Sequence, residues 1–205
     1  MELLIIRHGQ SQADLEDRHE GRADFPLTQL GVKQAQLLAE WVQERFPPEL
    51  ILSSPLQRAS RTAEILPGAT GAPLQLEPAL MEWNNGLLAG LARQEAAERF
   101  PLPPGGRRPH DTYAETESFI EFRARVEMFW SKFTYEHILP GAFKRIALVS
   151  HAGTITQLFR CFLGLPVVCD CFFSTGDTGV HLWSLESGRR TIVFANSLEH
   201  LQALG

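Results

Sequence analysis

Residues 3–9 of the chain read LLIIRHG, an uninterrupted apolar run that ends in two ionisable side chains and a glycine. A short, wholly apolar and partly β-branched run is typical of a strand buried on both faces, as in a parallel sheet covered by helices. Two later runs, at residues 50–52 and 146–149, share this character, and each precedes a small or polar turn. The sequence therefore predicts buried parallel strands with polar residues at their carboxyl ends.

Helical patterns alternate with these strands. Helices are expected from Thr28, a suitable N-cap, to the prolines at 47–48, then over residues 58–66 with an end at Pro67-Gly68, and over 154–163 with Gly164 as C-cap. Residues 179–183 and 190–194 predict a hairpin that closes one edge of the sheet. This alternation predicts an α/β fold, a three-layer αβα sandwich with a mostly parallel central sheet.

The pattern changes between about residues 83 and 141. Residues 86–100 are expected to be helical, residues 101–109 form a loop by composition, and residues 119–133 carry aromatic side chains at helical spacing. We interpret residues 1–205 as a single domain in which this region is an insertion that rims the functional site.

Composition excludes several classes of protein. With 205 residues and 44% apolar side chains, the chain is long enough to bury a core without disulfides or a structural metal. Its 19 Lys+Arg against 24 Asp+Glu give a net charge of −5, which argues against a nucleic acid or an anionic membrane as partner. Three late cysteines are no disulfide framework, and no signal peptide or membrane span is evident. We expect a reducing, cytoplasmic location and a monomer or homodimer.

The polar residues that follow the predicted strands are rich in chemistry. The strands are followed by Arg7-His8-Gly9, by residues 53–58 ending in Arg58, and by residues 150–153 with His151. Ligands of open α/β sheets bind beyond the carboxyl ends of the strands, so these side chains should meet there. Two guanidinium groups beside two imidazoles would form an anion pocket that also contains a nucleophile and proton donors.

The same residues resemble the signature of the histidine phosphatase superfamily, the phosphoglycerate-mutase-like fold. The resemblance runs in order along essentially the whole chain. Beyond the RHG tripeptide it includes the following blocks: residues 26–31 with Gln34-Ala35, residues 53–59 with Thr62-Ala63, Glu82 with Gly86, Glu117-Ser118 with Arg125-Val126, residues 150–153, and Asn196 with His200-Leu201.

The resemblance implies a metal-independent phosphomonoesterase that forms a phosphohistidine on His8. Glu82 would protonate the leaving oxygen and then activate water, while Arg7, Arg58 and His151 would clamp the phosphoryl oxygens. The phosphate-binding and substrate-binding set implied in this way is Arg7, Gly9, Ser11, Asp14, Gly21, Arg58, His151 and Ala152. A small phosphorylated metabolite is the expected partner, and neither a cofactor nor a metal is expected.

Three functions remain open at this point. The second hypothesis is a cofactor-dependent phosphoglycerate mutase. Two features argue against it: Asp14 stands where mutases of the family typically have Asn, and the chain is shorter than typical mutases. A non-catalytic phospho-ligand sensor is the third, although no expected catalytic residue is missing. Several residues keep two possible roles. Ser11 and Gln12 either contact phosphate or cap a turn, and Phe25 and Trp83 either line the mouth of the site or pack. Arg107-Arg108 form either a solvated loop or a specificity clamp.

Overall fold

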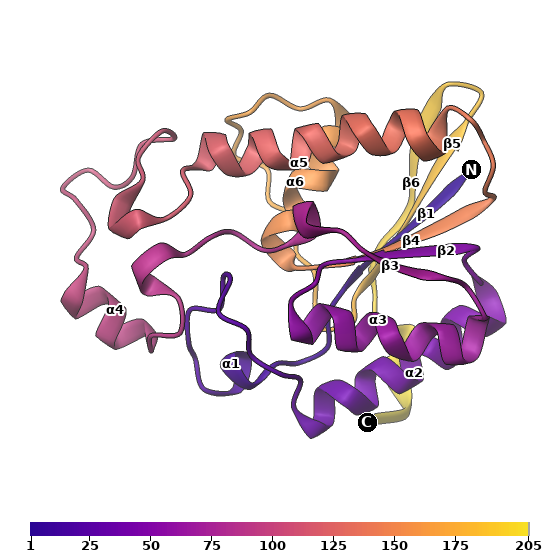
Figure 1. Ribbon diagram of the computed structural model, residues 1–205, viewed down its shortest axis with the longest axis horizontal. Coiled ribbons are helices and arrows are strands. Elements are labelled where there is room, and N and C mark those ends of the chain that lie inside the picture. The colour runs from indigo at the N-terminus through magenta and orange to yellow at the C-terminus, as the bar shows by residue number, and fades with distance from the viewer. Residues whose placement is uncertain (205) are drawn as a thin grey trace.

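The computed structural model describes residues 1–204, and a six-stranded mixed sheet lies at its centre (Figure 1). The strand order is β3-β2-β4-β1-β5-β6. The first four strands are parallel, β5 runs antiparallel to β1, and β6 runs antiparallel to β5. The strands are β1 (Glu2–Arg7), β2 (Leu50–Ser53), β3 (Leu74–Leu76), β4 (Arg145–Ser150), β5 (Val180–Glu186) and β6 (Arg189–Ser197). The predicted mostly parallel α/β sandwich and its edge hairpin are confirmed.

Helices cover both faces of this sheet. They are α1 (Gln12–Leu15), α2 (Gln29–Arg45), α3 (Gln57–Thr70), α4 (Arg93–Arg99), α5 (Phe119–Phe133) and α6 (Ala152–Leu163), joined by the 3₁₀ turns η1 (Pro78–Leu80), η2 (Gly86–Leu88), η3 (Tyr113–Glu115) and η5 (Glu199–Leu204) and the π-helical turn η4 (Thr134–Ile138). In Figure 1, α2 and α3 lie below the sheet, and α5 and α6 lie above it.

The alternation of side chains along β1 connects the two layers of the core. Leu4 and Ile6 pack into the cluster under α2 and α3, whereas Leu3 and Ile5 pack into the cluster under α5 and α6. All four side chains are fully buried. A strand that must be apolar on both faces cannot alternate with polar residues, which explains the unbroken LLII run.

Two helix ends follow the sequence signals. The Thr28 side chain accepts a hydrogen bond from the Gly31 amide at 2.9 Å and so caps α2. Gly164 ends α6 with φ of 67°, in the left-handed region that favours glycine.

The sequence predictions were wrong at two other places. Helix α3 does not end at Pro67-Gly68 but continues to Thr70 and ends at Gly71, whose φ is 72°. The expected helix over residues 86–100 is divided into η2 and α4, because Gly90 between them has a φ of 84°. Strand β3 and the short helix α1 were not predicted at all.

Strand register brings the three polar segments together at one end of the sheet. Arg7 at the end of β1 pairs with Ser150 of β4, and Ser53 at the end of β2 pairs with Val149 of β4. The His8 amide then donates to the Ser150 carbonyl at 3.0 Å. The chain segments that carry both histidines and both arginines are therefore neighbours.

Candidate active site

His8 follows β1 directly and is buried, with 1% of its surface exposed. Its Nδ1 lies 2.7 Å from the Gly9 carbonyl oxygen, which can only accept a hydrogen bond, so Nδ1 carries the proton. Burial, with the positive charges of Arg58 and Arg7, holds the pKa of His8 well below its ordinary value. The ring is therefore neutral near pH 7, and its Nε2 carries a free lone pair.

His151 lies beside His8 at the start of α6. The two ring centroids are 5.0 Å apart, and His151 Nε2 lies 2.8 Å from the Ser54 hydroxyl oxygen. Its pKa is also held well below the ordinary value, chiefly by burial and by the charge of Arg58. Burial is the largest cause of the neutral state of both imidazoles, and the charges of the two guanidinium groups add to it.

Arg58 projects from the first turn of α3 and is completely buried. Its Nη1 donates to the Ala23 carbonyl at 3.0 Å, and its Nη2 donates to the Gly21 carbonyl at 2.8 Å. These two bonds fix the orientation of the guanidinium plane. They also fasten the loop before α2 to the floor of the site.

Arg7 reaches the site from the end of β1. Its Nη1 donates to the Thr175 carbonyl at 2.8 Å, and its Nη2 lies 3.3 Å from Asp14 Oδ1 and 3.1 Å from Asp177 Oδ1. Two carboxylates therefore already balance this guanidinium.

Three buried nitrogen atoms of these residues have no hydrogen-bond partner. They are Arg7 Nε, Arg58 Nε and His151 Nδ1. Buried polar atoms are nearly always satisfied, so unsatisfied ones need an explanation, and an ion is one such explanation. Two of the three are guanidinium N–H donors, so an anion is the ligand chemistry that fits them.

Glu82 follows η1 and is held at the N-terminus of α6. Its carboxylate accepts from the Gly153 amide at 2.8 Å, from the Trp83 amide at 2.8 Å and from the Thr154 hydroxyl at 3.3 Å. A Cβ atom on Gly153 would lie 2.5 Å from Glu82 Oε1. Glycine at this position therefore makes room for the carboxylate.

The other residues that the sequence predicts for the site are placed less directly. The Gly9 amide donates to Thr62 Oγ1 at 3.1 Å, and a Cβ on Gly9 would lie 2.5 Å from the Gly31 carbonyl oxygen, so Gly9 allows the close approach of α2. Gly21 has a φ of 50° and presents its carbonyl to Arg58. Ala152 is the first residue of α6.

Ser11 and Asp14 form a capping box around α1. The Ser11 hydroxyl accepts from the Asp14 amide at 3.1 Å, and the Ser11 amide donates to Asp14 Oδ2 at 2.9 Å. Ser11 thus caps a turn, and its contact with phosphate stays a prediction. Asp14 serves the same turn and pairs with Arg7.

Two carboxylates of the site were missed in the sequence. Glu20 Oε2 lies 3.8 Å from His8 Nε2 and 3.4 Å from Arg58 Nε, and Asp177 pairs with Arg7. Glu20 directly precedes Gly21, which was predicted for the site, so its position along the chain was the available signal. Asp177 lies in the long connection between α6 and β5, where no motif marks it.

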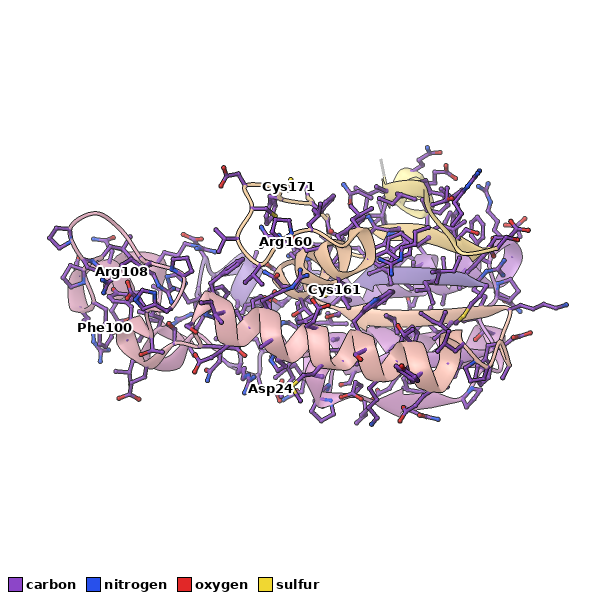
Figure 2. The ribbon with its side chains drawn as sticks, turned by 90° about the horizontal axis from the view of Figure 1, so that it is seen from above. Asp24, Phe100, Arg108, Arg160, Cys161 and Cys171 are labelled. Carbon is purple, nitrogen blue, oxygen red and sulfur yellow. The ribbon has the colours of Figure 1, made fainter. Side chains whose placement is uncertain are left out.

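The aromatic and basic residues of the 83–141 region surround a separate hollow. Trp83 packs on Phe122 with ring centroids 5.2 Å apart, and the Arg107 guanidinium lies 5.2 Å from the Trp83 ring centroid. Both side chains line a pocket of about 260 Å³ that Phe119 and Cys169 also border. Figure 2 shows Arg108 in the part of the molecule that projects from one end of the sheet.

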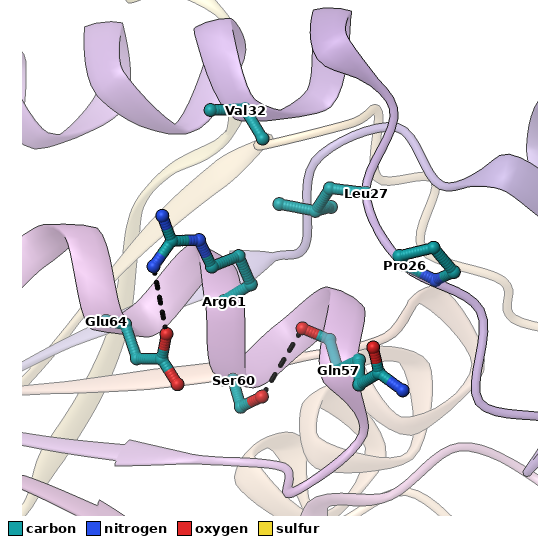
Figure 3. A pocket seen from close by; sticks show the side chains of 7 residues that line it. All are labelled: Pro26, Leu27, Val32, Gln57, Ser60, Arg61 and Glu64. Atoms are coloured by element: carbon teal, nitrogen blue, oxygen red, sulfur yellow. Dashed lines mark hydrogen bonds and ion pairs between the residues drawn. The ribbon is translucent and has the colours of Figure 1, made fainter.

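A surface groove between α2 and α3 is also visible (Figure 3). It has a volume of about 400 Å³, and it is lined by Pro26, Leu27, Val32, Gln57, Ser60, Arg61 and Glu64. Arg61 and Glu64 are paired with each other at 3.1 Å, and the lining includes none of the predicted catalytic residues. The chemistry of the molecule is therefore concentrated around the two histidines.

Two further observations concern the residues that the structure describes. Within residues 1–204, no group of three or more His, Cys, Asp or Glu side chains is arranged to hold a metal ion. No helix in the same part of the chain is long and apolar enough to cross a membrane.

The sequence and the structure are both similar to those of known proteins. The chain is 33% identical over 180 residues to a protein named "Probable phosphoglycerate mutase GpmB" from Proteus mirabilis, covering 83% of this chain and 78% of that one. It is 31% identical over 172 residues to the adenosylcobalamin/alpha-ribazole phosphatase of Escherichia coli, covering 81% of each. The structure of mycobacterial glucosyl-3-phosphoglycerate phosphatase with VO3 superposes with a TM-score of 0.79 at 28% identity, covering 96% of this chain and 98% of that one.

The family resemblance of the sequence is confirmed by a match along most of the chain. The model of the histidine phosphatase superfamily (branch 1) matches residues 3–197, a range that includes His8, Arg58, Glu82 and His151. The chain therefore belongs to the histidine phosphatase superfamily.

Proposed function

We propose that the chain is a phosphatase that hydrolyses small organic phosphomonoesters through a phosphohistidine on His8. The observation that carries this proposal is the state of His8, a buried and neutral imidazole whose Nδ1 is committed to the Gly9 carbonyl. Its Nε2 and the Arg58 Nε both face the same carboxylate oxygen, Glu20 Oε2, at 3.8 and 3.4 Å. A nucleophile and an anion-binding group are thus available within one site. Similarity to proteins named as phosphatases supports hydrolysis as the outcome.

In the first step, His8 Nε2 attacks the phosphorus atom and the bond from phosphorus to the leaving oxygen breaks. The charge on the three equatorial oxygens is stabilised by Arg7, Arg58 and His151, whose free nitrogen atoms are already oriented. Arg58 needs little reorganisation because its Nη atoms are fixed to two backbone carbonyls. Two fixed guanidinium groups supply the positive charge, so the proposed mechanism requires no metal.

Glu82 moves the proton in both steps. In its protonated form it gives the proton to the leaving oxygen, and as a carboxylate it then takes a proton from the water that attacks the phosphohistidine. The hydroxide attacks phosphorus, the bond to Nε2 breaks, and free phosphate leaves. The Gly153 and Trp83 amides hold the Glu82 carboxylate in place for this task.

A phosphoglycerate mutase is the second candidate, and the name of the Proteus mirabilis relative favours it. A mutase must keep the phosphohistidine until a second anionic substrate accepts the phosphoryl group. Asp14 and Asp177 on Arg7, with Glu20 near Arg58, make a site of low positive charge. Such a site retains a bisphosphorylated intermediate poorly, so we favour transfer to water.

The surroundings of the site complete the proposal. We further propose that residues 83–141 form an insertion that rims the site within a single domain, and that the pocket lined by Trp83 and Arg107 receives the leaving group. The substrate is a small phosphorylated metabolite, and we propose that the protein works in the cytoplasm.

The first experiment compares His8→Ala with His110→Ala. Hydrolysis of p-nitrophenyl phosphate in EDTA should fall about a thousandfold or more in His8→Ala because the nucleophile is removed. His110 is exposed and lies outside the site, so His110→Ala should keep full activity. Equal turnover by the two variants would contradict the mechanism.

A second experiment separates the three functions. A coupled assay with and without 2,3-bisphosphoglycerate measures isomerisation of phosphoglycerate, which should be slower than hydrolysis. Trapping of the wild-type protein during turnover should give a base-stable, acid-labile phosphoryl label that His8→Ala does not give. Isomerisation faster than hydrolysis would identify a mutase, and the absence of both turnover and label would identify a phospho-ligand sensor.

A further inference from the structure

Among residues 1–204, the Glu20 carboxylate is within 4 Å of both the proposed nucleophile and the buried arginine. Its Oε2 lies 3.8 Å from His8 Nε2 and 3.4 Å from Arg58 Nε, and its Oε1 accepts a hydrogen bond from the buried Ser11 hydroxyl. Only 15% of the Glu20 side chain is exposed. A phosphoryl group attacked by Nε2 and held by Arg58 Nε has to be next to, or in the place of, this carboxylate.

The backbone around Glu20 is held in position, so the loop does not easily carry the carboxylate away. Arg58 binds the carbonyls of Gly21 and Ala23, the two residues on either side of Arg22. Gly21 has a φ of 50°, and a Cβ atom on it would lie 2.7 Å from the Asn85 side chain. The loop is therefore fixed to both α3 and the segment after Glu82.

The charges that face Glu20 come from every side of the site. Arg58 on α3 and Arg7 at the end of β1 attract it, Asp14 on α1 repels it, and His8 faces it as a neutral ring. Burial makes the largest contribution and raises the pKa of Glu20 above its ordinary value. Ser11 opposes this rise by its hydrogen bond.

A phosphoryl dianion in this site would place like charges a few ångströms from the Glu20 carboxylate. Two such groups in one buried site do not both remain fully ionised, and one proton is taken up by the pair. His8 is not the acceptor of that proton, because protonation of Nε2 would remove the lone pair that attacks phosphorus. The Glu82 carboxylate is engaged by the Gly153 and Trp83 amides, whereas Glu20 lies 3.4 Å from the Arg58 Nε that would hold the phosphoryl group. The proton is therefore assigned to Glu20.

We propose that Glu20 is a specificity-determining residue of the phosphate site, which accepts a phosphoryl dianion only together with one proton. The proton resides on the Glu20 carboxyl group, which then donates a hydrogen bond to a phosphoryl oxygen. Without this proton, the Glu20 carboxylate would repel that oxygen. This inference rests on the proposed function only in taking phosphate as the ligand. The protonation of Glu20 therefore makes the affinity of the site for a phosphoryl dianion lower at alkaline pH and higher at mildly acidic pH.

The test uses Glu20→Gln, with Glu16→Gln as the matched control. Glu16 lies on the same segment, is exposed and pairs with Arg18, outside the site. Binding of inorganic phosphate to the full chain is measured by calorimetry at about pH 8 and about pH 6, in two buffers of different ionisation enthalpy, which reports the protons taken up.

At about pH 8, the wild type and Glu16→Gln should each take up nearly one proton per bound phosphate, and Glu20→Gln should take up almost none. Glu20→Gln should also bind phosphate about tenfold more tightly at that pH, since one nearby like charge has been removed. The advantage should shrink at about pH 6. Unchanged or weaker phosphate binding by Glu20→Gln at about pH 8, or equal proton uptake by the three proteins, would overturn the inference.

This readout is independent of turnover. Phosphate that binds with the expected Glu20 dependence to a protein without hydrolytic activity would support the inference and contradict the proposed function. Hydrolysis abolished by His8→Ala together with a Glu20→Gln variant of unchanged phosphate affinity would do the reverse.

Discussion

At the scale of single residues, Gly153 gives the most direct test of how Glu82 is held. A glycine in the first turn of α6 costs helix stability relative to alanine, so Gly153→Ala would ordinarily stabilise the protein by about 0.5–1 kcal/mol. Its Cβ would however lie 2.5 Å from Glu82 Oε1 and displace the carboxylate. We expect kcat for p-nitrophenyl phosphate to fall about 10- to 100-fold while the fold remains intact.

Gly68→Ala is the matched control for this substitution. Gly68 also lies inside a helix, α3, but a Cβ on it would meet no atom within 4 Å. We expect it to raise the free energy of unfolding by about 0.5–1 kcal/mol and to leave kcat unchanged. Full activity of Gly153→Ala would show that Glu82 does not need its position at the N-terminus of α6.

Arg58 holds the loop at residues 21–23 and is also the proposed phosphate-binding group, and a lysine cannot perform both tasks. Arg58→Lys keeps the charge, but its single ammonium nitrogen cannot reproduce the planar arrangement in which Nη1 and Nη2 bind the Ala23 and Gly21 carbonyls while Nε faces the ligand. We expect kcat/KM to fall about 100-fold, and the free energy of unfolding to fall by about 2 kcal/mol because buried bonds to a charged group are lost. Urea unfolding and steady-state kinetics measure the two effects, and Arg61→Lys on the exposed side of α3 should change neither.

Strand ends explain part of the predicted site, whereas Glu82 and Gly21 were predicted only from the family resemblance. Arg7, His8 and His151 directly follow apolar runs, so topology alone brings them together. Glu20 and Asp177 lie in loops whose path depends on tertiary contacts, such as the bonds from Arg58 to the Gly21 carbonyl. No local pattern encodes such contacts, which is why these carboxylates became visible only in the structure.

At the scale of elements, α5 holds the segment that carries Glu82. Arg125 on α5 donates to the carbonyls of Ala79 and Met81 at 2.7 and 2.9 Å and to that of Glu82 at 3.2 Å, and it pairs with Glu117 at 3.0 Å. A helix that binds three carbonyl groups within residues 79–82 through one side chain fixes the path of that segment. Arg125 is therefore a positioning residue for Glu82.

Arg125→Met should separate this positioning role from binding. We expect kcat to fall about 10-fold or more, because Glu82 loses its alignment, while the inhibition constant of inorganic phosphate changes little. Arg125→Lys should restore part of kcat. Lys132→Met on the exposed face of the same helix is the control and should keep the wild-type kcat. Equal loss of phosphate affinity and of kcat would indicate a collapsed site and contradict the positioning role.

Element boundaries were predictable where a local cap decides them and not elsewhere. Thr28 and Gly164 mark the ends of α2 and α6 through their own hydrogen bonding and backbone conformation. Pro67 did not end α3, although it has no backbone N–H to donate within the helix. The helix ends instead at Gly71, which adopts the left-handed conformation. Strand β3 has only three residues, and it forms by pairing with β2, a long-range contact that its sequence does not signal.

At the scale of the whole molecule, four buried histidines make stability depend on pH. His8 and His151 are kept neutral by burial and by the nearby guanidinium groups, and burial lowers the pKa of His181 and of His200 to about 4. In the unfolded chain each would have a pKa near 6.5. Below that value the unfolded state binds more protons than the folded one, so the free energy of unfolding falls as the pH falls from about 6.5 to about 4.

His181 is the residue through which this dependence is best measured. Its Nδ1 accepts from the Asn196 amide at 3.0 Å, and its Nε2 lies 2.9 Å from Thr175 Oγ1, so protonation of Nδ1 would break the bond to β6. Urea unfolding between pH 7 and 5 should show a stability loss of up to about 1.4 kcal/mol per pH unit for each such histidine. His181→Asn should be less stable at pH 7 but have a shallower slope, by about one proton, whereas His110→Ala at the surface should keep the wild-type slope. An unchanged slope in His181→Asn would mean that His181 is already protonated in the folded protein, which its bond from the Asn196 amide does not permit.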